Sequence, residues 1–187
     1  MIGELPKSLT VNNADYDIRT DFRDILNILC AFSDPELTDE EKVYVCLYTL
    51  YRDFDSLPES DYEAAFKGAI NFIDYGAAED GGKKKSPRVM DWEQDEMLLF
   101  SAVNKVAGFE TRSAEYLHWW TFMGYYMEIS DGLYAQILSL RSKKAKNKKF
   151  EKWETEFWRA NKDLCVLRPK LSEEEKRKKE RLNALLG

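Results

Sequence analysis

The stretch from Arg112 to Ile129, RSAEYLHWWTFMGYYMEI, is the feature that most constrains the fold. On a helix, its apolar and aromatic side chains cover nearly the whole circumference, which is typical of a helix buried on several sides. The stretch is interrupted by His118 and Gly124, and it is shorter than the ~20 apolar residues that cross a bilayer. We therefore predict a central aromatic helix with other helices packed around it. The expected core residues are Trp92, Phe100, Leu117, Trp119, Trp120, Phe122 and Met123.

The apolar patterns and capping residues along the chain predict a mainly α protein with one helical domain over residues 1–170 and a charged helix or tail over 171–187. Of 187 residues, 44% are hydrophobic and 33% are charged, an ordinary globular mixture. The net charge of −6 is unevenly distributed. Residues 1–74 carry 16 acidic and 6 basic side chains, whereas residues 132–187 carry 8 and 16. Such a chain could meet partners at two ends or pack its own ends together.

Turn and capping residues divide the first half of the chain. Asn12-Asn13 tolerates positive φ and predicts a small β-hairpin over residues 8–18. Capping residues predict three helices, which begin at Thr20 or Asp21, at Thr38 and at Ser60 or Asp61. The expected apolar face of the second helix comprises Val43, Val45, Leu47, Tyr48 and Leu50. The glycines, lysines and proline of residues 77–88 predict a mobile loop within the domain.

Further helices are expected in the second half. One is predicted from Asp91 to a stop at Gly108. Another follows Ser130 or Asp131, and its inward residues are expected to be Leu133, Ile137 and Leu140. The charged C-terminal helix begins with a capping box, Ser172 and Glu175. Three i,i+4 pairs support it: Glu173–Arg177, Glu174–Lys178 and Glu175–Lys179.

The run Arg141–Lys149, RSKKAKNKK, holds six basic residues in nine and precedes the aromatic residues Phe150, Trp153, Phe157 and Trp158. Basic grooves with stacking aromatics bind single-stranded nucleic acid. A solvated face and a docking site for an acidic protein partner are the other two interpretations. Nucleic acid is disfavoured because the chain is acidic overall. The candidate partner-contact residues are Lys143, Lys144, Lys146, Lys148, Lys149 and, without an obvious local partner at the chain end, Leu182, Leu185 and Leu186.

Nothing in the sequence predicts an enzyme, a cofactor or a metal site. There is one histidine, His118, and the three cysteines, Cys30, Cys46 and Cys165, are far apart, so metal-ligand spacing is lacking. The acidic segment 53–61 fails the calcium-loop pattern, because Leu57 and Pro58 stand where an Asp or Asn and a Gly are needed. No apolar signal sequence or transmembrane segment is expected, which predicts a cytoplasmic protein with buried free thiols.

Several motifs together resemble a family of small proteins from tailed phages and prophages of Gram-positive bacteria. They are TDFR at Thr20–Arg23, D-W-E-Q-D at Asp91–Asp95, and LHWW at Leu117–Trp120 followed by Phe122 and Met123. The resemblance also includes the N-terminal hairpin and extends from about Leu5 to Pro169. Such proteins are usually encoded between the major tail protein and the tape-measure protein.

The resemblance implies a non-enzymatic tail-assembly chaperone in the host cytoplasm, absent from the mature virion. It would keep the long tape-measure chain soluble until the tail tube polymerises. The implied partner is the tape-measure protein, with the major tail protein as a second candidate, and a homo-oligomer is possible. No catalytic residue carries over from the family. The competing hypotheses are a nucleic-acid-binding phage regulator using the basic C-terminal third, and an enzyme with an unrecognised site.

Overall fold

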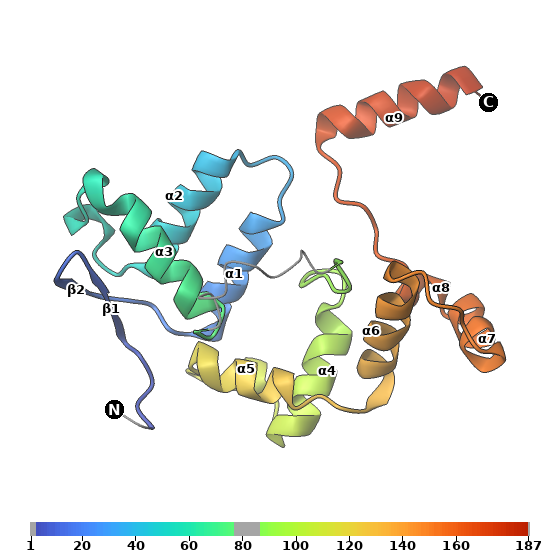
Figure 1. The fold of residues 1–187 in the computed structure, drawn as a ribbon, viewed down its shortest axis with the longest axis horizontal. Coiled ribbons are helices and arrows are strands. Elements are labelled where there is room, and N and C mark those ends of the chain that lie inside the picture. The colour runs from blue at the N-terminus through green and yellow to red at the C-terminus, as the bar shows by residue number, and fades with distance from the viewer. Residues whose placement is uncertain (1–2, 77–86, 187) are drawn as a thin grey trace.

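The protein is mainly α-helical with a two-stranded N-terminal hairpin (Figure 1). The computed structural model describes residues 3–76 and 87–186, with the backbone alone for Leu185 and Leu186. Most of the loop expected over 77–88 therefore lies outside the described residues. The elements are β1 (Ser8–Val11), β2 (Ala14–Asp17), α1 (Phe22–Phe32), α2 (Asp39–Leu50), α3 (Tyr62–Ile73), α4 (Glu96–Ala107), α5 (Trp119–Met127), α6 (Gly132–Ala145), α7 (Lys152–Ala160), α8 (Lys162–Cys165) and α9 (Glu173–Leu186).

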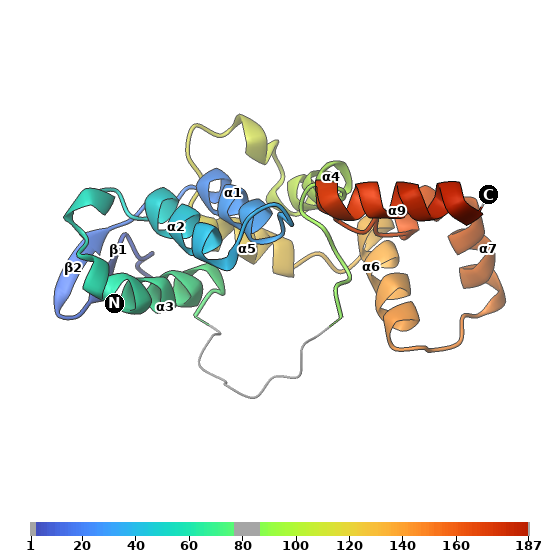
Figure 2. The ribbon, with the colours of Figure 1, turned by 90° about the horizontal axis from the view of Figure 1, so that it is seen from above.

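The molecule is elongated, and the first and last parts of the sequence occupy its two ends. Figures 1 and 2 show the hairpin with α2 and α3 at one end and α6, α7, α8 and α9 at the other. Helices α1, α4 and α5 lie between them. Helix α1 packs against α2 and α5, and α5 packs against α4. The acidic and basic parts of the sequence therefore lie largely apart, and they meet where Lys170 donates to the Ser33 hydroxyl and the backbone N of Glu173 donates to the Glu36 carboxylate.

The hairpin forms as the asparagine pair predicts. Asn12 and Asn13 have φ of 46° and 70°, the left-handed values of a tight hairpin turn. Strand β1 pairs antiparallel with β2, from Ser8 opposite Asp17 to Val11 opposite Ala14. Beyond β2, Ile18 pairs with Tyr51, and both side chains are buried. The hairpin is thus fastened to the end of α2.

Helices α1 to α3 begin where the capping residues predict. Asp21 caps α1, and Thr38 with Glu41 forms the complete capping box of α2. The buried face of α2 differs from the expected one: it comprises Cys46, Leu47 and Leu50. Tyr48 is 58% exposed, because it lies on the opposite side of α2, one turn after Tyr44.

The central helix is shorter than predicted. Helix α5 begins only at Trp119, and residues 111–113 form a separate 3₁₀ turn. The preceding residues are extended because their backbone pairs with the start of α1: Phe22 N donates to Leu117 O at 3.0 Å, and Trp119 N donates to Thr20 O at 2.7 Å. The TDFR and LHWW motifs therefore meet in space.

His118 caps α5 from a buried position. Its Nδ1 accepts a hydrogen bond from the backbone N of Trp120 at 3.0 Å. Because Nδ1 is an acceptor, Nε2 carries the proton and donates to the carbonyl oxygen of Pro6 at 2.9 Å. The only histidine therefore ties α5 to the chain segment before the hairpin.

Aromatic side chains from four helices form the core around α5. The Phe22 ring stacks on Phe122 with centroids 4.7 Å apart, and Trp119 stacks on Phe122 at 5.9 Å. Indole nitrogens tie α5 to α3, because Trp119 Nε1 donates to Ile73 O and Trp120 Nε1 to Phe72 O, both at 2.9 Å. Phe100, Leu117, Trp119 and Phe122 are buried, and Trp92, Trp120 and Met123 are partly buried against this core.

Two further expectations differ from the structure. Helix α4 begins at Glu96, and Asp91–Asp95 forms a turn, because the Asp91 carboxylate accepts from the next backbone N–H groups. In α6, Leu133 is 43% exposed, and the buried residues are Tyr134, Ile137, Leu140 and Arg141. The inward face of α6 is therefore rotated from the expected one.

Candidate partner-binding groove

An open groove of about 440 Å³ lies between α1 and α4. Its apolar lining is provided by Phe22, Leu26, Trp92, Leu99 and Phe100. Phe22 and Phe100 contact each other edge to face, with centroids 6.1 Å apart. Phe122 of α5 lies behind both rings, at 4.7 Å and 5.8 Å. The floor is thus part of the packed core and has a fixed shape.

Charged residues of both signs line the groove, and Glu96 interacts electrostatically with both Arg112 and Cys30. Arg23 and Arg112 line the end beside the start of α1, whereas Glu93 lines the end beside Cys30. Arg23 is fixed in place by Asp21 at 2.9 Å and by the carbonyl oxygen of Ala114 at 2.5 Å. The groove therefore offers an apolar floor with charged side chains of both signs around it.

Arg112 lies across the Phe100 ring, 5.1 Å from its centroid, and pairs with Glu110 at 2.7 Å. The hydrogen bonds from Arg112 lower the pKa of the Glu110 carboxyl to about 2. Arg112 therefore stays paired throughout the physiological pH range. It closes one end of the groove as a positioned cation.

The Cys30 thiol lines the acidic end of the groove. Burial raises its pKa, and Glu93 raises it further. A thiol with a raised pKa is a poor nucleophile, which disfavours a catalytic role for Cys30. The reactivity of the Cys30 thiol reports whether the groove is occupied, because the side chain lines the groove and is only partly buried.

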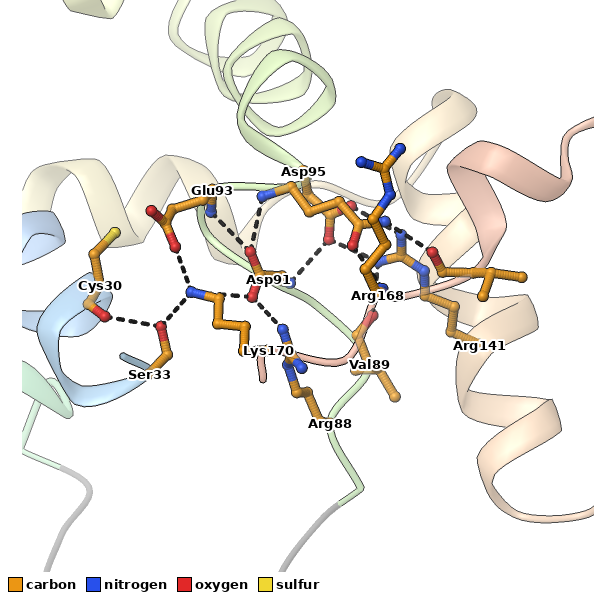
Figure 3. Close-up of polar contacts among 12 residues, drawn as sticks. Cys30, Ser33, Arg88, Val89, Asp91, Glu93, Asp95, Arg141, Arg168 and Lys170 are labelled. Atoms are coloured by element: carbon orange, nitrogen blue, oxygen red, sulfur yellow. Dashed lines mark hydrogen bonds and ion pairs between the residues drawn. The ribbon is translucent and has the colours of Figure 1, made fainter. Parts of the chain in front are cut away.

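The D-W-E-Q-D motif forms the turn that positions the start of α4 (Figure 3). Asp91 Oδ1 accepts from the backbone N of Gln94 at 2.8 Å. The Gln94 side chain clamps a distant segment, since it donates to Val166 O and accepts from Arg168 N, both at 2.8 Å. The polar residues of the motif thus hold this turn and connect it to distant segments, Glu93 through its ion pair with Lys170.

Asp91 also holds basic residues from two other segments. Its carboxylate pairs with Arg88 and lies 3.5 Å from the Lys170 ammonium group. Lys170 also donates to the Ser33 hydroxyl at 2.6 Å and pairs with Glu93 (Figure 3). Burial opposes ionisation of Asp91, but the hydrogen bonds from Gln94 and Arg88 outweigh it, so its pKa is lowered.

Arg141, the first residue of the basic run, is buried and therefore not a surface contact. Only 4% of its side chain is exposed, and it forms a bidentate pair with Asp95 at 2.6 Å and 2.8 Å. It also donates to the carbonyl oxygens of Val89, Leu164 and Cys165. All five N–H groups of its guanidinium thus have acceptors.

Two of the candidate contact lysines, Lys143 and Lys144, contact other side chains, and Lys144 is also exposed. Lys143 pairs with the buried Glu154 of α7, and Lys144 lies over the Trp158 ring at 4.3 Å. Lys146, Lys148 and Lys149 are exposed. In α7 the buried residue is Glu154, whereas Trp153 is 51% exposed.

The predicted capping box of α9 is present, with Ser172 and Glu175 bonded reciprocally. Of the three expected ion pairs, Glu174–Lys178 forms at 2.7 Å, whereas Glu173 pairs with Lys176. Among the candidate contacts at the chain end, Leu182 is 56% exposed. The side chains of Leu185 and Leu186 lie outside the described residues.

Sequence reasoning missed the groove. Phe22, Leu26 and Cys30 recur at four-residue spacing and form a second stripe beside the buried stripe of α1. Packing against one neighbouring helix buries only a single apolar stripe, so the greater width of this apolar face indicates a second contact surface on α1. Likewise, the spacing of Tyr134, Ile137 and Arg141 places Arg141 on the inward face of α6.

Within residues 3–76 and 87–186, no group of three or more His, Cys, Asp or Glu residues could hold a metal ion. In the same part of the chain, no helix combines the length and apolar character needed to cross a membrane. The groove between α1 and α4, by contrast, combines an apolar floor that is part of the packed core with charged side chains around it.

Comparison with known proteins identifies the family. The family model of the bacteriophage Gp15 protein matches residues 1–167. The chain belongs to the bacteriophage Gp15 protein family. It is therefore a phage protein of a family that is not a known enzyme family, and membership suggests a structural or assembly-related role. No curated protein matches the chain. No solved structure matches it either.

Proposed function

We propose that this Gp15-family protein is a tail-assembly chaperone that binds helical segments of the tape-measure protein. The observation that carries the proposal is the groove between α1 and α4, with its apolar floor and charged ends. An amphipathic helix binds such a groove through apolar residues on one face. The resemblance in the sequence motifs supports the identity of the partner.

The shape of the groove fits a chaperone that must later release its client. A volume of about 440 Å³ accommodates a few anchoring side chains and not a whole domain. Each site would then bind with moderate affinity. Many copies on one long chain would hold it firmly through avidity and still leave one at a time.

The experiment fills the groove without removing core residues. Asn27 is an exposed groove-lining residue of α1, so Asn27→Trp should occupy the groove and leave the fold intact. We expect its co-expression with the phage tape-measure protein to give at least about tenfold less soluble tape-measure protein than the wild type. The matched control is Asn71→Trp, at an exposed position of α3 away from the groove.

Thermal unfolding of both variants verifies that they fold. Wild-type yields with Asn71→Trp and low yields with Asn27→Trp would support the groove as the binding site. Equal yields with both variants would contradict it. A wild-type protein that leaves the tape-measure protein insoluble would contradict the chaperone function itself.

The end of α9 is a second proposed contact with the tape-measure protein. Leu182 is exposed, and Leu185 and Leu186 follow it on the same helix. The test is a truncated chain that ends at Lys170, which keeps the contacts of Lys170 with Ser33 and Asp91. We expect a lower yield of soluble tape-measure protein. An unchanged yield would exclude α9 from the contact.

The nucleic-acid alternative is not supported. Two of the six basic residues in its proposed site are engaged within the protein, since Arg141 is buried and Lys143 pairs with Glu154. Electrostatic binding to DNA or RNA would weaken steeply with salt. Salt-dependent retention on a DNA column would be evidence for this alternative.

A further inference from the structure

Exposed aromatic rings gather on α2 and the loop that follows it, at the end of the molecule formed by the acidic part of the sequence. Tyr44 and Tyr48 of α2 are 53% and 58% exposed and stack at 5.9 Å. Phe54 contacts both of them edge to face, at 5.4 Å and 5.8 Å, and stacks on Tyr62 at 5.5 Å. We call these four residues the tyrosine surface. Tyrosines that are exposed yet fixed by their neighbours are typical of protein interfaces.

Carboxylates lie close in sequence to the tyrosine surface, and the neighbouring cation Arg19 is engaged with the carbonyl oxygens of Tyr48, Thr49 and Tyr51. Asp53 and Asp55 flank Phe54, and Glu40 lies one turn before Tyr44 on the same side of α2. All three are exposed. Within the described part of the chain, none of them forms an ion pair. The surface therefore favours a partner that presents cations beside apolar area.

The opposite end of the molecule presents those groups. Lys144, Lys146, Lys148 and Lys149, which we call the lysine surface, are all exposed. Lys144 and Lys148 also line a shallow cleft of about 430 Å³ with Phe150 and Trp158. Lys146, Lys148 and Lys149 form no ion pair with a described residue.

The turn that carries the lysine surface is held by the backbone. Lys148 N donates to Lys143 O at 2.9 Å, and Asn147 takes a positive φ of 52°. The lysines are therefore presented on an ordered turn, which lowers the entropic cost of using them in an interface.

The two surfaces cannot meet within one chain. Helix α2 lies at one end of the elongated molecule and the turn after α6 at the other (Figures 1 and 2). We propose that the tyrosine surface of one copy binds the lysine surface of a second copy. Lysine ammonium groups would then lie over tyrosine rings and beside carboxylates, a combination of cation–π and ionic attraction.

Copies arranged head to tail through this contact build rings or open filaments, whereas two antiparallel copies make the contact twice and close as a two-fold dimer. The proposal does not depend on the groove, and it is tested on the protein alone.

The experiment uses two variants of exposed residues. The tyrosine variant is Tyr44→Ser with Tyr48→Ser, and the lysine variant replaces Lys146, Lys148 and Lys149 by Glu. Light scattering measures the mass of each. We expect the wild type to form a dimer or larger species that dissociate as salt is raised. Each variant alone should associate at least about tenfold more weakly.

Mixing the two variants provides the decisive result. Each retains the surface that the other lacks, so an equal mixture should give a dimer and nothing larger. A matched control, Met97→Ser with Met127→Ser, removes exposed apolar side chains elsewhere (73% and 53% exposed) and should keep the wild-type mass. A monomeric wild type, wild-type masses for both variants, or a mixture that stays monomeric would each overturn the proposal.

Discussion

The guanidinium of Arg141 and the carboxylate of Asp95 form a bidentate ion pair in which the two side chains are 4% and 1% exposed. The pair joins α6 to the turn that begins α4, two segments 46 residues apart. A basic residue that belongs to a surface run by sequence therefore connects the C-terminal helices to the aromatic core. Its partner is the last residue of the D-W-E-Q-D motif.

The first prediction concerns this pair. Arg141→Ala should lower the free energy of unfolding by about 3–5 kcal/mol, because it leaves the Asp95 carboxylate buried without its cation. Chemical denaturation measures the loss. Lys149→Ala, an exposed change in the same basic run, should stay within about 0.5 kcal/mol of the wild type. Similar losses for the two variants would refute the structural role of Arg141.

The two adjacent tryptophans should differ in their contribution to stability. Trp119 is 1% exposed, so Trp119→Ala should cost about 3–5 kcal/mol. Trp120 is only partly buried, although it stacks on Phe72 at 5.9 Å, so Trp120→Ala should cost about 1–3 kcal/mol. Equilibrium unfolding in urea separates the two. A larger loss of stability for Trp120→Ala than for Trp119→Ala would show that Trp120 is the principal core residue.

Asp91 should make stability depend on acid pH. Its pKa in the folded protein lies below the ordinary value of 3.8, so its contribution is present above that value. The contribution is lost as the pH falls through the folded-state pKa. Asp91→Asn keeps an oxygen for the turn but removes the charge that Arg88 and Lys170 contact. The variant should therefore lose less stability than the wild type between about pH 5 and pH 2.

The matched control for this comparison is Asp55→Asn. Asp55 is exposed and forms no ion pair with a described residue, so the control should follow the wild-type curve. Urea midpoints measured across the pH series give the comparison. Parallel curves for the wild type and Asp91→Asn would show that the contacts of Asp91 do not favour its ionised form.

Thiol labelling should report on the groove. Cys30 is partly buried, whereas Cys46 and Cys165 are 0% exposed, so iodoacetamide should modify Cys30 first. Burial also raises the pKa of Cys46 to about 12, which further slows its reaction. The rate at Cys30 should rise with pH, because the thiolate is the reactive form and the pKa of Cys30 is raised.

Binding of the tape-measure protein should slow the labelling of Cys30, since the thiol lines the groove. Mass spectrometry of the labelled peptides measures the rate with and without the partner. The labelling rate of Cys46 in the unfolded protein serves as the reference for a fully accessible thiol. Unchanged labelling of Cys30 in a soluble complex would place the partner outside the groove.

Local signals in the sequence determined the secondary structure wherever the residues that form a turn or cap a helix all lie within one short segment. Asn12-Asn13 specifies the hairpin turn, and Thr38 with Glu41 specifies the start of α2, because each device acts within a few residues. The same holds for the stop of α4 at Gly108, which has φ of 79°. The mainly α class followed from such devices and from the aromatic residues.

Only the tertiary structure decided which side chains are buried and which are available to a partner. Helix α5 is short because the backbone around Leu117 pairs with the start of α1, a contact between residues far apart in sequence. Arg141 is buried because Asp95 and three carbonyl oxygens surround it, which its neighbours in the run do not reveal. The groove, likewise, exists only where α1 and α4 come together over Phe122. Short-range hydrogen bonding fixes where a helix begins, whereas burial depends on contacts that only the folded chain brings together.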